Sequence, residues 1–241
     1  MMTFQVLSRC GSREVNEDSV YAECLNGCNL FVVADGLGGH GKGDVASMLA
    51  VNAFKETFSN HSEPLPALLT KAFLNAQTAI LAEQTRTGCP FQMKTTVCAL
   101  AIDDGKLMWG HIGDTRLYAF SHNKIKVRTL DHSVPQMLVL AHDIKEKDIR
   151  NHPDRNKLLR VLGVSGDVPK FEVTEIQNVT KFQAFLLCSD GFWEHILEKE
   201  MCVTLKKSSS AAEWLEEMLK IVEQRGSSVD MDNYSAITVW M

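Results

Sequence analysis

The distribution of hydrophobic residues along the chain predicts a protein made largely of β-strands. Short segments that are rich in β-branched and aromatic residues are expected to form strands. They are Asn29 to Ala34, Thr95 to Ile102, Lys106 to Ile112, Arg116 to Phe120, Lys124 to Thr129, Ala184 to Cys188 and Ser235 to Met241. Short turns separate several of them, and Asp103-Asp104-Gly105 suits a hairpin because Asp and Gly tolerate positive φ. Antiparallel meanders are therefore expected.

Apolar residues spaced three and four positions apart predict three helices. The clearest stripe lies between Ala211 and Val222, and two more helices are expected from Asp44 to Phe58 and over much of Leu65 to Thr85. Strands and helices do not alternate regularly, which favours an α+β layered fold with antiparallel sheets. No repeat or Pro/Gly/Ser-rich linker divides the sequence, so residues 1–241 are expected to form a single domain.

Composition and charge narrow the class of protein. The 241 residues are 45% hydrophobic and 23% charged, as in ordinary globular proteins, and the formal net charge is -5. This charge gives no electrostatic reason to bind nucleic acid or an anionic membrane. The sequence has neither the pattern of a secretory signal nor an apolar run long enough to span a membrane. A cytoplasmic protein with no membrane or nucleic-acid partner is expected.

The seven cysteines do not form a recognisable ligand or disulfide pattern. Their number is odd, and no CxxC pair occurs. Cys98 and Cys188 lie inside predicted strands and are interpreted as small core residues in a reducing compartment. Cys24 and Cys28 could also bind a soft metal, but no neighbouring residue completes such a site.

Four aspartates stand at the ends of predicted strands. Asp35 follows LFVVA and precedes GLGGH, Asp190 follows AFLLCS, Asp114 follows KLMWGHIG, and Asp232 directly precedes the last strand. Taken singly, each would more often be a turn residue or a helix cap. If they converge, they repel one another unless cations neutralise them. A ligand set made only of oxygen favours hard ions such as Mg²⁺ or Mn²⁺, which suit phosphate-ester chemistry.

The N-terminal segment supplies a charge of the opposite sign. Arg13 stands in the segment GSREVNED, and a guanidinium offers parallel donors that match two phosphate oxygens. Alone, this residue would be interpreted as a surface arginine. Near a metal cluster, it would supply the substrate-binding half of a phosphatase site.

Eight segments, taken in order, resemble the signature blocks of the metal-dependent protein phosphatases of type 2C, the PPM family, in their compact bacterial form. The segments are GSREVNED, VADGLGGHGKGDVAS, KTTVCAL, GHIGDTRLYAF, LDHS, HPDRNKLLRVLG, LLCSDGFWE and DNYSAITVW. The resemblance covers roughly residues 4 to 240. It implies a four-layer α-β-β-α sandwich, in which helices flank two antiparallel sheets and a metal site lies in a cleft at one end.

The resemblance also implies a set of metal ligands. Asp35 matches the carboxylate that bridges two metal ions, and Gly36 matches a ligand that uses its backbone carbonyl. Asp190 and Asp232 match the remaining ligands of the first ion. Asp114, together with Asp190, matches a weaker third site. The expected cofactors are two Mn²⁺ or Mg²⁺ ions, with a third ion at the weaker site.

Other positions match the residues around the metal ions. Glu17 and Asp18 match the acidic pair that holds metal-bound water, and Arg13 matches the arginine that binds phosphate. Leu37 stands where some members have a histidine that is a candidate general acid. His40, three residues later, is the nearby candidate for contact with the leaving group or the substrate.

Two further positions depart from the pattern of the family. Lys94 stands where a glycine usually precedes the Thr pair, and Asp44 replaces the more usual glutamate. Neither belongs to the matched ligand set. The segment from Ser133 to Gly163 resembles the flap that borders the cleft, and its charged half is expected to be exposed and mobile.

The function implied is that of a protein serine/threonine phosphatase. A hydroxide that bridges two divalent ions is expected to attack phosphorus in line. The partners would be phosphorylated proteins and a counteracting serine/threonine kinase, and the chain is expected to be a monomer. The segments DNYSAITVW and SDGFWEHI also resemble phosphatases that accompany type VI secretion systems. A non-catalytic regulator that binds phosphoproteins and a phosphatase of a small metabolite remain as alternatives.

Overall fold

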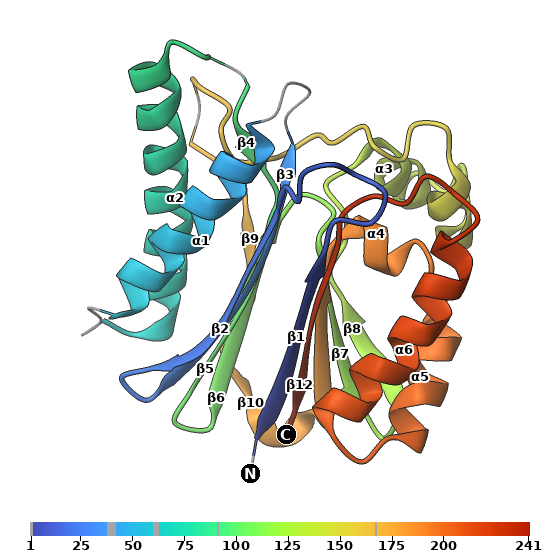
Figure 1. Ribbon diagram of the computed structural model, residues 1–241. Coiled ribbons are helices and arrows are strands. Elements are labelled where there is room, and N and C mark those ends of the chain that lie inside the picture. The colour runs from blue at the N-terminus through green and yellow to red at the C-terminus, as the bar shows by residue number, and fades with distance from the viewer. Residues whose placement is uncertain (1, 38–41, 60–62, 91, 167) are drawn as a thin grey trace.

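Two antiparallel sheets lie face to face, and helices cover their outer faces (Figure 1). The computed structural model describes residues 2–37, 42–59, 63–90, 92–166 and 168–241. Helices α1 and α2 pack on one sheet, and α5 and α6 pack on the other. This arrangement confirms the predicted α-β-β-α sandwich.

The first sheet brings the two ends of the chain together. Its strand order is β1 (Thr3–Arg9), β12 (Tyr234–Trp240), β11 (Ala184–Cys188), β7 (Arg116–Ser121) and β8 (Lys124–Arg128). In the register of β1 and β12, Arg9 lies opposite Tyr234. The loop that follows β1 therefore lies beside the loop that precedes β12.

The second sheet carries the longest strand. Its order is β10 (Gln177–Asn178), β6 (Lys106–Ile112), β5 (Val97–Asp103), β3 (Cys28–Leu37) and β2 (Asp18–Leu25), with β4 (Lys94–Thr95) paired to β3 and β9 (Glu172–Val173) paired to β6. The predicted hairpin between β5 and β6 is confirmed. Asp104 and Gly105 have φ values of 43° and 72°, the left-handed conformation that this turn requires.

Helices occupy the outer layers and the connections near one end of the sandwich. They are α1 (Gly43–Ser59), α2 (Leu65–Thr87), α3 (Val134–Leu140), α4 (Asp190–Trp193), α5 (Glu198–Lys207) and α6 (Ala211–Gly226), with 3₁₀ helices at Glu146–Asn151 and Val179–Lys181. The three helices predicted from periodicity are α1, α2 and α6. Helix α6 begins where the Ser210 hydroxyl accepts the backbone N–H of Glu213. Within the described part of the chain, no helix combines the length and apolar character that a membrane span needs.

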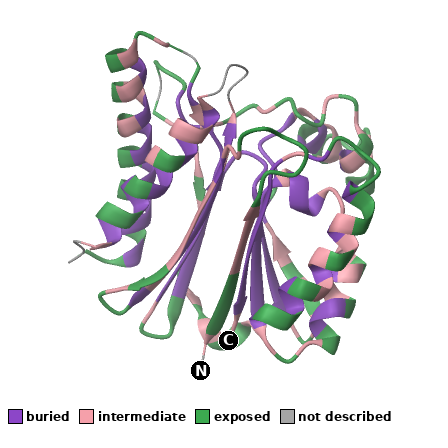
Figure 2. Cartoon of the chain, viewed as in Figure 1, coloured by how far each residue is buried: buried purple, intermediate pink, exposed green. Residues whose placement is uncertain are grey.

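The alternation of side chains along β3 connects the layers. Leu30 and Val32 belong to the core beneath α1 and α2, whereas Phe31 and Val33 belong to the core between the sheets. All four are fully buried, and Figure 2 shows buried residues running through both sheets. Burying each such side chain contributes about 1.5–3 kcal/mol. The cysteines predicted to be core residues, Cys98 and Cys188, are also fully buried.

A buried ion pair joins the first sheet to the connection that follows β8. The Arg116 guanidinium donates to both carboxylate oxygens of Asp131, at 2.8 Å and 2.6 Å, and both side chains are almost completely buried. The same guanidinium lies 3.5 Å from the centre of the Trp193 ring. The Trp193 indole N–H donates to the backbone oxygen of Asp114 at 3.0 Å. This cluster fixes the backbone at the end of β6.

Asp131→Ala is expected to lower the free energy of unfolding by about 3–5 kcal/mol, because it leaves the Arg116 charge buried without its counter-ion. Urea denaturation monitored by tryptophan fluorescence measures this change. The control is Arg86→Ala, which breaks an exposed ion pair with Glu83 on α2 and should cause no measurable change. An Asp131→Ala protein as stable as the wild type would show that the ion pair contributes nothing to stability.

Candidate active site

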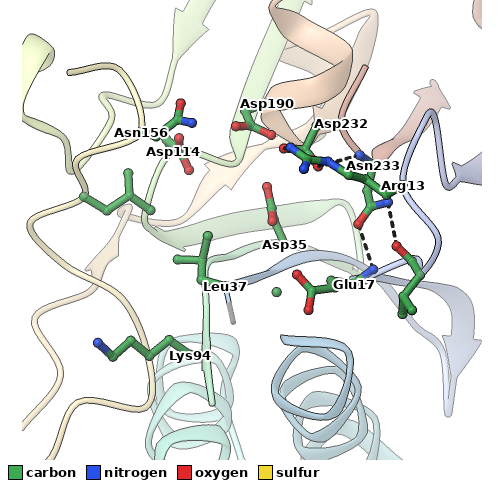
Figure 3. Close-up of a pocket in the computed structure, with 13 residues that line it drawn as sticks. Arg13, Glu17, Asp35, Leu37, Lys94, Asp114, Asn156, Asp190, Asp232 and Asn233 are labelled. Carbon is green, nitrogen blue, oxygen red and sulfur yellow. Dashed lines mark hydrogen bonds and ion pairs between the residues drawn. The ribbon is translucent and has the colours of Figure 1, made fainter. Parts of the chain in front are cut away.

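A cavity of about 730 Å³ lies at the end of the sandwich where β3, β6 and β11 finish (Figure 3). The residues predicted for the metal and phosphate sites line it: Arg13, Glu17, Asp35, Gly36, Asp114, Asp190 and Asp232. The structure therefore brings together residues from five separate parts of the sequence. His40 lies outside the described residues.

Asp35 lies within a strand. The strand before it was predicted to end at Ala34, but β3 continues to Leu37 by pairing with β4. The Thr96 N–H donates to the Asp35 carbonyl oxygen at 2.9 Å, and the Asp35 N–H donates to the Thr96 hydroxyl at 3.2 Å. The backbone of Asp35 is thus held on a regular scaffold, while its carboxylate points into the cavity.

Gly36 permits a close approach of three segments. A Cβ atom at Gly36 would lie 2.2 Å from the carbonyl oxygen of Gly43 and 2.5 Å from that of Glu17. Only glycine fits here without a shift of the backbone. The Glu17 carboxylate, in turn, accepts the N–H of Gly43 at 3.3 Å. The start of α1 is therefore packed directly against the strand that carries Asp35.

Asp114 and Asp190 reach the cavity from the ends of two other strands. Asp114 follows β6 after Gly113, whose φ of 100° turns the chain, and Asp190 is the first residue of α4 after β11. Burial, and then the neighbouring Asp190, raise the pKa of Asp35 and of Asp114 well above the usual range. Burial also raises the pKa of Asp190, to about 7. These carboxylates are therefore expected to need a cation in order to be ionised together.

Asp232 lies at the rim of the cavity and binds Arg13. Its side chain is 45% exposed, and the Nε and Nη2 atoms of Arg13 donate to its two oxygens at 3.0 Å each. The prediction treated Arg13 as a lone guanidinium beside the acidic cluster. The structure instead pairs it with Asp232, one of the predicted metal ligands. The same carboxylate thus contacts the arginine predicted to bind phosphate and is itself predicted to bind a metal ion.

Asn233 positions the N-terminal part of the site. Its side-chain oxygen accepts the Glu17 N–H at 2.8 Å, and its amide nitrogen donates to the carbonyl oxygens of Cys10 and Val15 at 2.9 Å and 3.0 Å. These bonds hold the loop that carries Arg13 next to Asp232. Sequence reasoning gave Asn233 no role. Its position directly after Asp232 was the available signal.

The hydrogen bonding of Asp18 indicates whether the acidic cluster suits a cation. Its Oδ2 atom accepts the Ser189 hydroxyl at 2.8 Å, but its buried Oδ1 atom has no hydrogen-bond partner among the described residues. Burial raises the pKa of this carboxyl to about 7. Asp18 does not line the cavity, but it lies opposite Asp35 in the pairing of β2 with β3. An unpartnered carboxylate oxygen next to the acidic cluster fits a hydrated hard cation.

A second cluster of potential ligands has a different geometry. The rings of His111 and His132 stack 4.7 Å apart at 8°, and His132 also contacts Glu172 at 3.2 Å. A metal ion binds an imidazole lone pair in the plane of the ring, and two parallel planes share no such position. The Gly113 N–H donates to the His132 Nδ1 atom at 3.1 Å. The pair therefore supports the turn before Asp114.

The predicted flap borders the cavity through Asn156 and Leu158. The expectation that its charged half is exposed is wrong for two residues of the 3₁₀ helix. Ile149 is 2% exposed, and the Arg150 Nη2 atom donates to the Ile196 carbonyl oxygen at 2.8 Å and to Glu198 at 2.9 Å. This part of the flap is thus packed against the segment that leads into α5.

Comparison with known proteins identifies the family. The family model for protein phosphatase 2C matches residues 8–234, which is most of the chain. The chain belongs to the protein phosphatase 2C family. The serine/threonine phosphatase stp of Listeria welshimeri is 37% identical over 196 residues, which cover 76% of this chain and 74% of the relative. The chain is therefore a serine/threonine phosphatase and a hydrolase, as its motifs predicted.

Two solved structures that resemble this chain extend the comparison. The catalytic domain of the serine/threonine protein phosphatase PstP, in complex with two manganese ions, is 26% identical with a TM-score of 0.82 and covers 99% of this chain and 97% of its own. PppA, a key regulatory component of T6SS in Pseudomonas aeruginosa, is 26% identical with a TM-score of 0.80 and the same coverage. Protein phosphatase 2C enzymes are metal-dependent, which agrees with the oxygen-rich cavity.

Asp35→Asn is expected to raise the melting temperature of the metal-free enzyme at pH 7.5. The pKa of Asp35 is higher in the folded state than in the unfolded state, so above the unfolded-state pKa this carboxyl destabilises the fold, whereas the neutral amide of Asn does not. Mn²⁺ at a hundredfold excess over its Kd should raise the wild-type melting temperature by about 5–10 °C and that of the variant much less. Differential scanning fluorimetry measures both shifts.

The control is Asp104→Asn, in the hairpin between β5 and β6, which should respond to Mn²⁺ like the wild type. If Asp35→Asn also responds fully, Asp35 does not bind the ion.

Proposed function

We propose that this chain hydrolyses phosphoserine and phosphothreonine in proteins at a site that holds two divalent cations. The observation that supports this most is the convergence of Asp35, Asp114 and Asp190 at the ends of three strands, in one cavity with Arg13. Burying carboxylates in this way costs free energy unless they bind cations. The cavity thus combines sites for metal ions and for a phosphate group.

Each acidic residue has a proposed role toward Mn²⁺ or Mg²⁺. Asp35 would bridge two ions, with the Gly36 carbonyl on one of them, and Asp190 and Asp232 would complete the first site. Asp114 with Asp190 would hold a third ion. Glu17 and Asp18 would orient water around the ions. When bound there, the cations would lower the pKa of water from about 15.7 toward neutrality and offset the charge of the phosphoryl group.

Arg13 is proposed to bind the phosphoryl oxygens. Its Nε and Nη2 atoms are used by Asp232, whereas its Nη1 atom has no hydrogen bond to another described residue. The ion pair holds the guanidinium at the rim of the cavity, so it can donate to phosphate without a large loss of side-chain entropy. None of the described residues that line the cavity is a cysteine. The proposed reaction therefore does not pass through a cysteinyl-phosphate intermediate.

A segment of a phosphoprotein is the proposed substrate. Asn156 and Leu158 of the flap line the cavity, so a peptide that extends beyond the phosphorylated residue would contact the flap. Such an enzyme would act as a single-domain monomer in the cytoplasm and oppose a serine/threonine kinase. The similarity to PppA supports a role in type VI secretion as one setting.

The enzyme is expected to release phosphate from phosphoserine and phosphothreonine peptides in the presence of Mn²⁺, and from phosphotyrosine peptides much more slowly. EDTA should stop the reaction, because aspartate and water ligands exchange readily. Malachite-green detection of phosphate measures the rates, with Asp35→Asn as the inactive control. Hydrolysis of small phosphorylated metabolites at higher kcat/KM than any phosphopeptide would favour the metabolite phosphatase. Phosphopeptide binding without turnover would favour the non-catalytic protein.

Arg13→Ala is expected to lower kcat/KM for phosphopeptides about 10- to 100-fold, the loss of one charge-assisted interaction. The same variant should bind Mn²⁺ several-fold more tightly, because Asp232 no longer has a competing cation. Isothermal titration calorimetry measures the metal affinity. Arg9→Ala, which breaks an ion pair with Glu223 outside the cavity, is the control. Weaker Mn²⁺ binding by Arg13→Ala would mean that Arg13 builds the metal site.

A further inference from the structure

The cavity carries a second basic side chain, on the opposite side of Asp35 from Arg13. Figure 3 shows Lys94 on this side, with its amine directed away from the carboxylates. Among the described residues, Lys94 forms no ion pair and no side-chain hydrogen bond, whereas Arg13 is bound to Asp232 through two hydrogen bonds. Lys94 is thus a cation at the cavity wall that does not neutralise the acidic cluster.

The backbone of Lys94 is fixed on both sides. Lys94 lies opposite Leu37 in the pairing of β4 with β3. The next residue, Thr95, exchanges two backbone hydrogen bonds with Leu162, at 3.2 Å and 2.9 Å. The Thr95 side chain is fully buried and donates to the Asp35 carbonyl oxygen at 2.8 Å. Because side chains alternate along a strand, the Lys94 side chain, which lines the cavity, points to the opposite face from that of Thr95.

The side chains at and around Lys94 suit an anionic group that lies next to the phosphate of the substrate, and not that phosphate itself. An ammonium group is a compact charge with three donors, and it binds carboxylates and phosphates without a fixed geometry. Leu37 lies next to Lys94, and Leu158 lines the same cavity, so apolar surface accompanies the charge. A peptide that places its phosphorylated residue at the acidic cluster could extend over this surface.

We propose that Lys94 forms a subsite for an anionic side chain close to the phosphorylated residue of the substrate, either a carboxylate or a second phosphate. This proposal rests on the phosphoprotein phosphatase activity proposed above. It makes phosphoproteins with an acidic residue near the phosphorylation site the preferred class of substrate. Lys94 is half-buried, so solvent screens the interaction. The preference is expected to be about fivefold, equivalent to about 1 kcal/mol.

A set of phosphothreonine peptides tests the subsite. The parent peptide has alanine at the three positions on each side of the phosphothreonine. Its derivatives carry Glu, Lys or a non-hydrolysable phosphonate analogue of phosphoserine at one position at a time. The quantity measured is kcat/KM of each derivative relative to the parent, determined within one enzyme, so that a general loss of activity in a variant cancels.

Four enzymes are compared: wild type, Lys94→Ala, Lys94→Glu and the control Lys106→Glu. Lys106 is an exposed lysine at the far end of β6, and it does not line the cavity. The wild type and the control should favour Glu at one position about fivefold, and Lys94→Ala should lose this preference. Lys94→Glu should favour Lys at the same position. The preference should weaken at high salt. A larger effect of the phosphonate than of Glu would identify a second phosphate as the ligand.

Equal rates for all derivatives in the wild type would overturn the proposal, as would an unchanged preference for Glu in Lys94→Glu. These outcomes leave the phosphatase activity intact and therefore contradict the subsite alone. If the wild type hydrolyses none of the peptides, the proposed function fails and the subsite fails with it.

Discussion

Repulsion among the carboxylates of the cleft is the constraint on which the site depends. Asp35, Asp114 and Asp190 come from separate strands, and each has a raised pKa because of burial and its acidic neighbours. Packing in the rest of the fold must therefore supply the free energy that holds them together when no cation is bound. A divalent ion that binds here removes this repulsion, and the free energy released adds to the affinity for the ion.

The fold meets this cost mainly through backbone contacts. The backbone of Asp35 is bound to Thr96, and the backbone oxygen of Asp114 accepts the indole N–H of Trp193. Gly36 packs against Gly43 at a distance that no other residue allows. The carboxylate groups themselves are left with few partners, as the Oδ1 atom of Asp18 shows. A rigid backbone thus presents side chains whose oxygens remain available to ions and water.

The sequence predicted the interior strands better than the edge strands. Strands β3 and β11 are buried on both faces, so they appear in the sequence as continuous apolar runs. Strand β1 has no buried residue, and β2 mixes polar and apolar residues, so neither gave a clear pattern. Helix α5 was also not predicted, because three of its ten residues are buried and the rest are mostly charged or polar.

Residues of the site also differ in how well the sequence predicted them. Asp35 and Asp190 were predicted because each directly follows an apolar run and precedes a glycine. The ion pair of Arg13 with Asp232 and the bonds of Asn233 were not predicted, because their partners are more than two hundred residues apart in the chain. Such contacts depend on the pairing of β1 with β12, which is a tertiary property. The roles of these residues toward metal and substrate stay predictions.

The pairing of β1 with β12 has a consequence for biosynthesis. The Asp232 carboxylate that binds the Arg13 guanidinium, and the Asn233 amide that holds the loop of Arg13, are translated 219 and 220 residues after Arg13. A nascent chain that already contains Asp35, Asp114 and Asp190 still lacks the strand that brings this loop to the cleft. The contact of Arg13 with Asp232 therefore forms only when β12 has inserted between β1 and β11. Formation of this part of the site is therefore a late step in folding, because it joins residues more than two hundred positions apart.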